Sequence, residues 1–196
     1  MVVLWLIQIA NVVFSLDLVR FGVYPRKLSG LMGILFAPLI HGSFNHIFSN
    51  TLALLVLGTA MLIGYPRSSK FVIPIIYLGA GLLVWIFGRA SFHIGSSGLT
   101  FGLLTFTFVV GALRWDPKAI ALSCLVFFMY GSMIWGIFPT TPGVSFESHF
   151  FGAVIGVLCA ILFRYYDPKQ PRKRYDWEDE GDEAPVDDED NKHTLH

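Results

Sequence analysis

The chain alternates between long apolar stretches and short polar breaks. Each stretch has about the length that a helix needs to cross a hydrocarbon core of ~30 Å at ~1.5 Å per residue. Since lipid offers the backbone no hydrogen-bond partner, such stretches must be helical. The pattern therefore predicts an all-α, polytopic membrane protein with six transmembrane helices. They run over approximately residues 1–19, 45–64, 71–88, 97–113, 119–138 and 148–165.

The connection between the first two stretches, residues 21–44, is too long for a simple turn. It is broken by glycine and proline at Pro25, Gly30, Gly33, Pro38 and Gly42. Residues 31–37 within it are apolar but too few to cross the membrane. We expect this segment to lie in the outer interface or to re-enter it, and a plain connecting loop is an equally good interpretation.

Composition supports the membrane interpretation. Charged residues make up 14% of the 196 residues, whereas about a quarter is usual for a soluble domain. Ten of the 14 acidic residues fall between Asp176 and Asp190. The remaining chain has too few charges to cover a soluble surface, so we predict an integral membrane protein embedded in a lipid bilayer.

The charge pattern divides the chain into a helical domain over residues 1–167 and a cytoplasmic tail over residues 168–196. The tail begins with a basic cluster and continues as an acidic run, which predicts a solvated, disordered segment. No nucleic-acid partner is expected, because the acids next to the cluster would repel phosphate. The cluster consists of Lys169, Arg172, Lys173 and Arg174.

Basic residues near the predicted helix ends also indicate orientation. With the N-terminus inside, nine Lys or Arg residues lie on the cytoplasmic side and four on the outer side. We therefore predict that both termini are cytoplasmic. The two cysteines, Cys124 and Cys159, lie in apolar stretches without metal-ligand spacing. No metal or cofactor is expected.

Candidate chemistry gathers at the outer ends of the predicted helices. Ser97 lies at a loop-to-helix junction in Gly95-Ser96-Ser97-Gly98, and His149 lies near the outer end of the last helix. Polar groups at membrane depth are costly and indicate function by default. A hydroxyl and an imidazole on two helices are what a nucleophile and its general base need. A helix-capping serine and an interfacial histidine are the structural alternatives.

Two further patterns favour a shared site. Gly98-x-x-x-Gly102 and Gly152-x-x-x-Gly156 follow Ser97 and His149, and such small-residue spacings allow helices to pack closely in a membrane. His46 and Asn50 are four residues apart, so they share one helix face. Both can donate hydrogen bonds to a developing oxyanion, although an interhelical structural role is the alternative.

Taken together, these motifs resemble the rhomboid family of intramembrane serine proteases. The resemblance covers nearly the whole chain up to about residue 165. It rests on order, spacing and helix assignment. The matching motifs are His41-x-x-x-x-His46-x-x-x-Asn50, Gly95-Ser96-Ser97-Gly98-x-x-Phe101-Gly102 and His149-x-x-Gly152-x-x-x-Gly156.

The resemblance implies a Ser–His dyad with Ser97 as nucleophile and His149 as general base. His46, Asn50 and the backbone N–H of Ser97 would form the oxyanion pocket. Phe101 would stack on the catalytic imidazole. The remaining motif residues, His41, Gly95, Gly98, Gly152 and Gly156, are expected to support the site. Many family members carry a Trp-Arg pair in the first outer loop, and the positions just upstream of His41 here lack it.

The implied function is a serine endopeptidase of a bacterial inner membrane. Its substrate would be a membrane protein cut near the outer face, at a transmembrane segment with helix-breaking or small residues. A rhomboid-like protein that binds or escorts clients without cleaving them is the main alternative. A small transporter or channel is less well supported, because the polar residues gather at one end instead of spreading through the membrane depth.

Overall fold

The computed structural model describes residues 1–140 and 143–169, so all but the first two residues of the predicted tail lie outside the described residues. Five helices are long and apolar enough to cross a membrane. Four of them are α3 (Phe44–Gly64), α4 (Ser69–Phe87), α5 (Ser97–Arg114) and α7 (Phe146–Phe163). The fifth consists of α6 (Pro117–Tyr130) and the 3₁₀ helix η4 (Gly131–Ile137) that continues it. Apart from one isolated bridge, the described chain forms no strands, which confirms an all-α polytopic bundle.

The first apolar stretch differs from the prediction. It forms α1 (Val2–Val13), a helix of 12 residues, which covers only about 18 Å at ~1.5 Å per residue. The helix ends there because Ser15 and Asp17 adopt positive φ angles of 49° and 46°. The described residues thus contain five helices of spanning length where the hydrophobic pattern predicts six.

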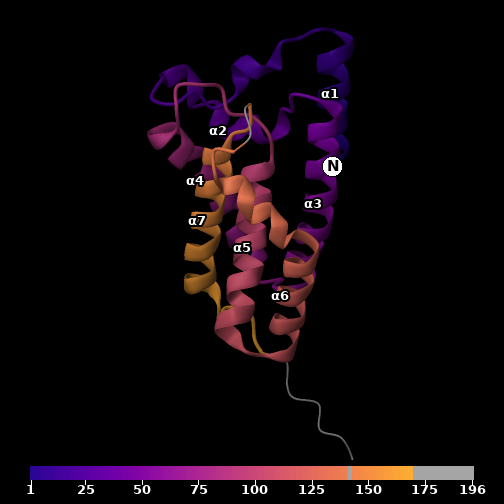
Figure 1. The fold of residues 1–196 in the computed structure, drawn as a ribbon, viewed down its shortest axis with the longest axis vertical. Coiled ribbons are helices and arrows are strands. Elements are labelled where there is room, and N and C mark those ends of the chain that lie inside the picture. The colour runs from indigo at the N-terminus through magenta and orange to yellow at the C-terminus, as the bar shows by residue number, and fades with distance from the viewer. Residues whose placement is uncertain (141–142, 170–196) are drawn as a thin grey trace, which may run out of the picture.

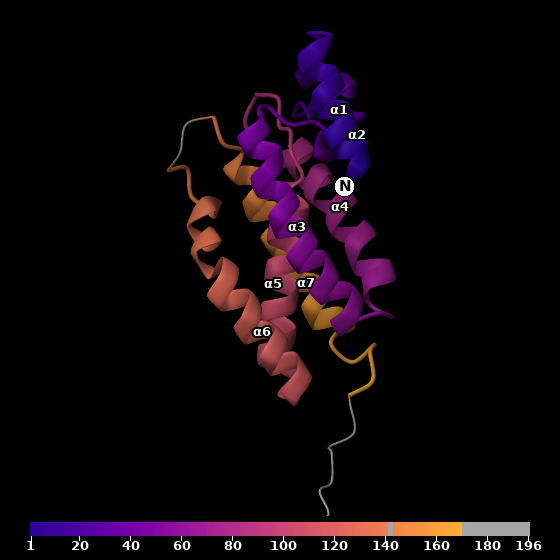
Figure 2. The same ribbon diagram turned by 90° about the vertical axis from the view of Figure 1, so that its right-hand side faces the viewer.

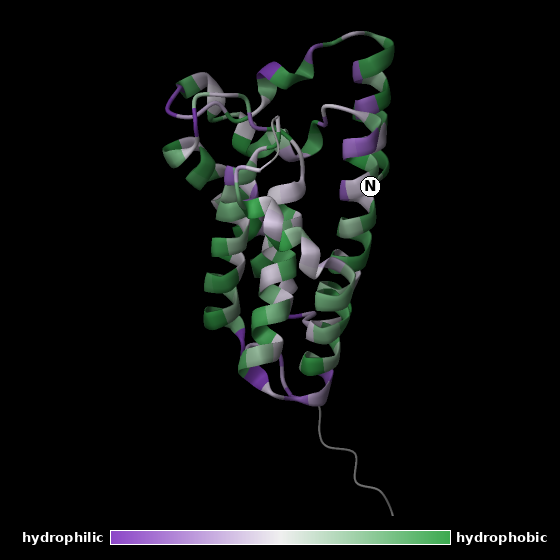
Figure 3. Cartoon of the chain, in the orientation of Figure 1, coloured by the Kyte–Doolittle hydropathy of each residue, from purple (hydrophilic) through white to green (hydrophobic). Residues whose placement is uncertain are grey.

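Helix α5 occupies the centre of the bundle (Figures 1 and 2). Most of its residues are buried, and α3, α4, α6 and α7 all contact it. In contrast, α6 buries only Ala119, Ser123 and Val126 and lies at the edge of the bundle in Figure 2. The helices are apolar along their length, and hydrophilic residues gather at the two ends (Figure 3). This distribution is the one that a bilayer demands.

The segment between α1 and α3 (residues 14–43), the predicted first outer loop, contains several short helical turns at one end of the bundle. They are η1 (Leu18–Phe21), η2 (Leu28–Gly30), α2 (Gly33–Phe36) and η3 (Ala37–Leu39). Residues 31–37 therefore form short helical turns at the end of the bundle and do not cross it.

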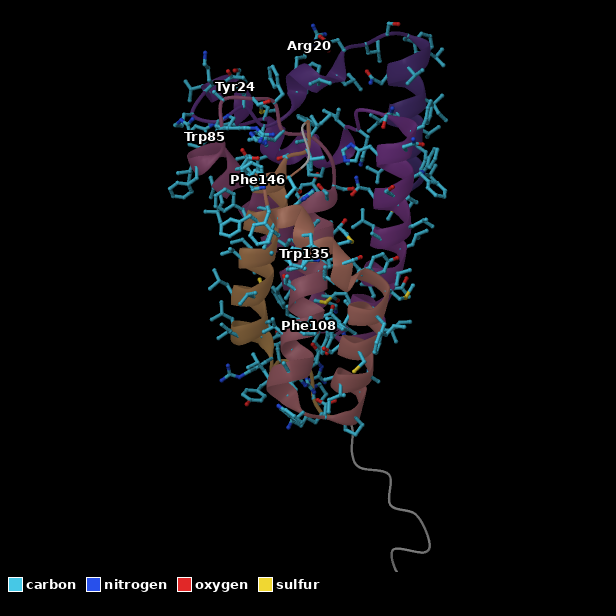
Figure 4. All side chains as sticks on the ribbon, in the orientation of Figure 1. Arg20, Tyr24, Trp85, Phe108, Trp135 and Phe146 are labelled. Atoms are coloured by element: carbon cyan, nitrogen blue, oxygen red, sulfur yellow. The ribbon has the colours of Figure 1, made fainter. Side chains whose placement is uncertain are left out.

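This loop is anchored without the Trp-Arg pair of the family. The Arg26 guanidinium donates to the carbonyls of Ile86 at 3.2 Å and Gly88 at 2.9 Å, at the end of α4. The Trp85 indole donates to the carbonyl of Lys27 at 2.9 Å. Trp85 and Tyr24 are both labelled in this upper region in Figure 4. One Arg and one Trp from two different segments thus hold the loop on α4.

Candidate active site

Ser97 is the first residue of α5, and the loop before it makes a turn that needs glycine. Gly95 has φ of +102°, a conformation that side chains rarely adopt. A Cβ at this position would also lie 2.7 Å from Cε1 of His46. Gly95 therefore lets the backbone pass directly beside the His46 ring, so that Ser97 lies at the first position of α5.

His149 meets Ser97 across the α5–α7 contact. Its Nε2 lies 2.9 Å from the Ser97 Oγ. Its Nδ1 lies 2.8 Å from the carbonyl oxygen of Gly136 in η4. A carbonyl only accepts, so this contact places the ring proton on Nδ1 and leaves Nε2 to accept the Ser97 hydroxyl proton. The arrangement is that of a nucleophile paired with a neutral base.

The His149 ring is covered by Phe101 on one face and bounded by Gly136 at its Nδ1 edge. The Phe101 ring stacks on it with centroids 4.2 Å apart and an interplanar angle of 6°. Gly136 closes the remaining space, since a Cβ there would lie 2.9 Å from Phe101 Cζ and 3.2 Å from His149 Nδ1. Packing and the Gly136 hydrogen bond together fix the orientation of the imidazole.

The glycine positions lie where α5 and α7 cross. A Cβ on Gly152 would overlap the carbonyl oxygen of Gly98, and one on Gly156 would overlap that of Gly102. The Thr105 hydroxyl, one turn deeper, lies 3.0 Å from the Ala153 carbonyl oxygen. The two backbones are therefore close enough for Ser97 and His149 to reach each other.

His46 and Asn50 lie on α3 and line the same cavity as Ser97 and His149. The cavity has a volume of about 570 Å³. The Asn50 amide donates to the His46 carbonyl at 3.1 Å, which holds its side chain along the helix. The His46 backbone N–H is capped by the Ser43 hydroxyl at 3.1 Å. The structure thus brings together all four polar residues of the predicted site.

His41 does not line this cavity but lies behind it. Its side chain is buried, its Nε2 is 3.3 Å from the Ser96 hydroxyl, and its ring meets the His46 ring edge-on at 5.0 Å. Burial, assisted by repulsion from His46, lowers the pKa of His41 to about 4. A neutral His41 therefore packs against the His46 ring and forms a hydrogen bond with the Ser96 hydroxyl.

No group of three or more His, Cys, Asp or Glu side chains that could hold a metal ion occurs among residues 1–140 and 143–169. The carboxylate nearest to His149 in sequence, Glu147, lies 3.5 Å from Nε of Arg89 and 3.9 Å from Nδ1 of His93. The partner of the His149 Nδ1 is instead a backbone carbonyl.

Sequence reasoning did not identify the roles of Gly136 and His93. Gly136 acts through its carbonyl, which every residue has, so no residue type marks it. His93 is recognisable only as one of the histidines on the outer side. Its buried contacts with Arg89 and Ser145 depend on how the loops fold.

Comparison with known proteins assigns this architecture to a family. The Rhomboid domain model matches residues 29–166, which is well over half of the chain. The chain belongs to the rhomboid family. The matched region begins in the first outer loop and ends just after α7, so it contains every residue of the site described above.

Similar proteins occur in mycobacteria. A protein of Mycobacterium tuberculosis, named only as uncharacterized, is 37% identical over 150 residues, which cover 72% of this chain and 62% of the relative. An uncharacterized protein of Mycobacterium leprae is 35% identical over 176 residues, covering 83% of this chain and 68% of the relative. The chain thus spans less than two thirds of the length of the first of these relatives.

Proposed function

We propose that this rhomboid protein is an intramembrane serine endopeptidase with Ser97 as nucleophile and His149 as general base. The family supports the proposal, because its members are intramembrane serine proteases. The observation that carries it to this chain is the 2.9 Å contact between the Ser97 Oγ and the His149 Nε2. The second His149 nitrogen is held by the Gly136 carbonyl, so the base has the tautomer that the reaction needs.

In the proposed reaction, His149 Nε2 takes the Ser97 proton as Oγ attacks the scissile carbonyl carbon. The resulting imidazolium then gives this proton to the leaving amine, and an ester to Ser97 remains. Water, activated by the same nitrogen, hydrolyses the ester. The Gly136 carbonyl stabilises the imidazolium by accepting a hydrogen bond from its Nδ1–H throughout.

Charge developing on the substrate oxygen needs donors that are already in place. The backbone N–H of Ser97 supplies one at the start of α5, where helical N–H groups have no intrahelical partner. His46 and Asn50 supply side-chain donors from the opposite wall of the cavity. His41 and the glycines at positions 95, 98, 152 and 156 support this arrangement without touching the substrate.

The proposed substrate is a membrane protein whose transmembrane segment unwinds locally at small or helix-breaking residues. A helix hides its own carbonyls, so the scissile bond must leave helical structure before Ser97 can attack it. We place the site near the outer face of a bacterial inner membrane, with the C-terminus cytoplasmic. The proposed reaction needs no metal or cofactor.

The test compares cleavage of a transmembrane substrate by the wild type, Ser97→Ala and His149→Ala in detergent or liposomes. Both variants are expected to lose cleavage, and fluorophosphonate labelling is expected to disappear in Ser97→Ala. Ser96→Ala is the matched control, because it removes the adjacent hydroxyl and leaves the Ser97–His149 pair in place. Equal cleavage by Ser97→Ala and the wild type would show that the protein is not a Ser97-dependent protease.

A further inference from the structure

Three separate segments of the outer end meet on His93, a residue that the dyad does not use. Its backbone pairs with Val23 of the first outer loop through hydrogen bonds of 2.9 and 3.0 Å. Its Nε2 lies 3.1 Å from the carbonyl oxygen of Arg89, and its Nδ1 lies 2.6 Å from the hydroxyl of Ser145. The side chain is only 2% exposed, so the segments are joined through the interior.

The partners of His93 set the direction of its hydrogen bonds. The Arg89 carbonyl can only accept, so Nε2 carries the proton and Nδ1 accepts from the Ser145 hydroxyl. The Ser145 oxygen is then available to accept from the Ser148 hydroxyl at 2.7 Å and from the Ser148 backbone N–H at 3.4 Å. The result is a chain of hydrogen bonds, here called the relay, in which Ser148 donates to Ser145 and Ser145 donates to His93. Burial lowers the pKa of His93, which favours this neutral form.

The relay joins the two segments that lead into the members of the dyad. His93 precedes Ser97 by four residues, and Ser145 precedes His149 by the same interval. Ser145 is also the N-cap of α7, so its orientation sets the first turn of the helix that carries His149. The Ser148 carbonyl in that turn packs against Gly98, 3.1 Å from where its Cβ would lie.

We infer that His93 is a positioning residue for the dyad: through Ser145 it fixes the first turn of α7 relative to the loop that delivers Ser97. The inference rests on the proposed function. It makes the Ser97–His149 distance depend on a second His–Ser pair on the same two segments. A displacement of about 1 Å between reacting groups can lower a rate by about 100-fold.

A second link between the same segments is made by the Arg89 side chain. The Arg89 guanidinium donates to the Val144 carbonyl at 2.8 Å and lies 3.5 Å from the Glu147 carboxylate. The Glu147 carboxylate also lies 3.9 Å from Nδ1 of His93. Because the Arg89 contacts remain when the His93 ring is removed, we expect such a variant to fold with a loosened dyad.

The test measures kcat per active site, counted by fluorophosphonate titration, for His93→Leu, His93→Asn and Ser145→Ala. We expect His93→Leu to lower kcat per titrated site by about 100-fold with KM little changed. His93→Asn keeps an acceptor near the Nδ1 position and loses the hydrogen bond to the Arg89 carbonyl. Its kcat per titrated site should therefore stay within about fivefold of the wild-type value. The double variant that combines Ser145→Ala with His93→Leu should have a kcat per titrated site little lower than that of the single variants.

Ser69→Ala is the matched control, because Ser69 is a buried serine at the opposite end of the bundle whose hydroxyl donates to the Pro66 carbonyl at 3.1 Å. A purely structural role of His93 would reduce the number of titratable sites and leave kcat per site unchanged. That outcome, or equal kcat for His93→Leu and the wild type, overturns the inference.

Amide hydrogen exchange separates this inference from the proposed function. In His93→Leu, peptides covering residues 93–98 and 145–150 should both exchange faster, and in Ser69→Ala neither should. If the wild type neither labels nor cleaves, the proposed protease function fails and the exchange data alone judge the relay. Unchanged exchange at both peptides in His93→Leu overturns the relay in either case.

Discussion

The orientation of one imidazole depends on a backbone carbonyl and a missing side chain. The Gly136 carbonyl accepts a hydrogen bond from His149 Nδ1 at 2.8 Å. Because Gly136 has no Cβ, η4 can approach the stacked Phe101 and His149 rings. Carboxylates perform the orienting task in many Ser–His–Asp enzymes. A carbonyl leaves the site without a buried negative charge, which suits a low-dielectric membrane environment.

Gly136→Ala is therefore expected to impair the chemistry more than the fold. The added methyl would lie 2.9 Å from Phe101 Cζ and 3.2 Å from His149 Nδ1, so η4 must retreat and lengthen the hydrogen bond to Nδ1. We expect kcat to fall by at least about tenfold. Gly58→Ala is the control, because a Cβ there meets nothing within 4 Å. If Gly136→Ala cleaves as fast as Gly58→Ala, the carbonyl does not orient the base.

His41 makes the stability of the outer end depend on pH. Its pKa falls from 6.5 to about 4 in the folded protein, so the unfolded chain binds more protons between these values. Stability is thus fully present above pH 6.5 and declines as the pH falls toward 4. The expected loss between pH 7 and 5 is up to about 2 kcal/mol. His93, whose pKa is also lowered by burial, acts in the same direction.

The measurement is the unfolding free energy in mild detergent at pH 7 and pH 5, for the wild type and His41→Gln. The variant should be less stable at pH 7, where the neutral His41 contacts are intact, and should show a smaller difference between the two pH values. An equal pH difference in both proteins would mean that His41 is not the group responsible.

The residue types in the sequence predicted much of the site. The backbone groups that contact these side chains could not be predicted from residue types. Ser97, His149, His46 and Asn50 stand out because polar side chains are rare in apolar helices, and the structure places all four around one cavity. The Gly136 carbonyl and the Ser145 relay have no such compositional signal. They arise only when η4 and the outer loops pack against the first turns of α5 and α7.

At the level of elements, the close approach of α5 and α7 is what holds the dyad together. Gly152→Ala would place a methyl group on the Gly98 carbonyl oxygen, and backbone atoms cannot move aside as a side chain can. We expect separation of the two helices near the site, with destabilisation of roughly 1–3 kcal/mol from overpacking. Cleavage per folded molecule should fall by at least about tenfold, since Ser97 and His149 move apart.

Gly58→Ala again provides the matched comparison, because it is also a glycine-to-alanine change within a spanning helix. It should keep wild-type cleavage and unfold at or slightly above the wild-type temperature, as alanine favours helices. Unfolding temperature and cleavage rate are measured on the same preparations. If Gly152→Ala behaves like Gly58→Ala in both, the two helices do not depend on this contact.

Helix boundaries were predictable where proline and charge interrupt the apolar pattern. The predicted range 45–64 corresponds to Phe44–Gly64, and 97–113 corresponds to Ser97–Arg114. The range 119–138 was predicted as one helix, but its hydrogen bonding changes from α to 3₁₀ at Gly131. Apolarity is the same on both sides of Gly131, so the hydrophobic pattern carries no mark of this change.

In the whole molecule, the α6–η4 segment lies between the dyad and the surrounding lipid. It is largely exposed: Phe128 is 83% exposed, and Phe127, which stacks on Phe108 of α5, is still 53% exposed. Its contact with α3 includes a hydrogen bond of 3.4 Å from the Tyr130 hydroxyl to the Leu52 carbonyl. Of the five spanning helices it has the smallest buried share, so its displacement would expose the fewest buried residues.

The same segment contains Gly136. Substrate entry would require this segment to move away from the bundle, whereas the proposed catalysis requires it to stay in contact with His149. In the proposed protease, a transmembrane substrate would enter from the lipid between α6 and α3, whereas the proposed dyad needs η4 in contact with His149. Displacement of α6 for access must therefore be followed by return of η4 before the acylation step. This predicts that substrate cleavage depends on α6 mobility while attack on a small reagent does not.

A linker between α6 and α3 tests this prediction. Cysteines introduced by Leu52→Cys and Tyr130→Cys, with the exposed Cys124 replaced by alanine, would be joined by a short bismaleimide. Cross-linked protein should cleave a transmembrane substrate at least about tenfold more slowly than the same variant before cross-linking. Its rate of labelling by a small fluorophosphonate should stay unchanged, because the reagent reaches Ser97 through the cavity of about 570 Å³. Full cleavage after complete cross-linking would exclude passage between α6 and α3, and loss of labelling would show that the linker distorts the dyad itself.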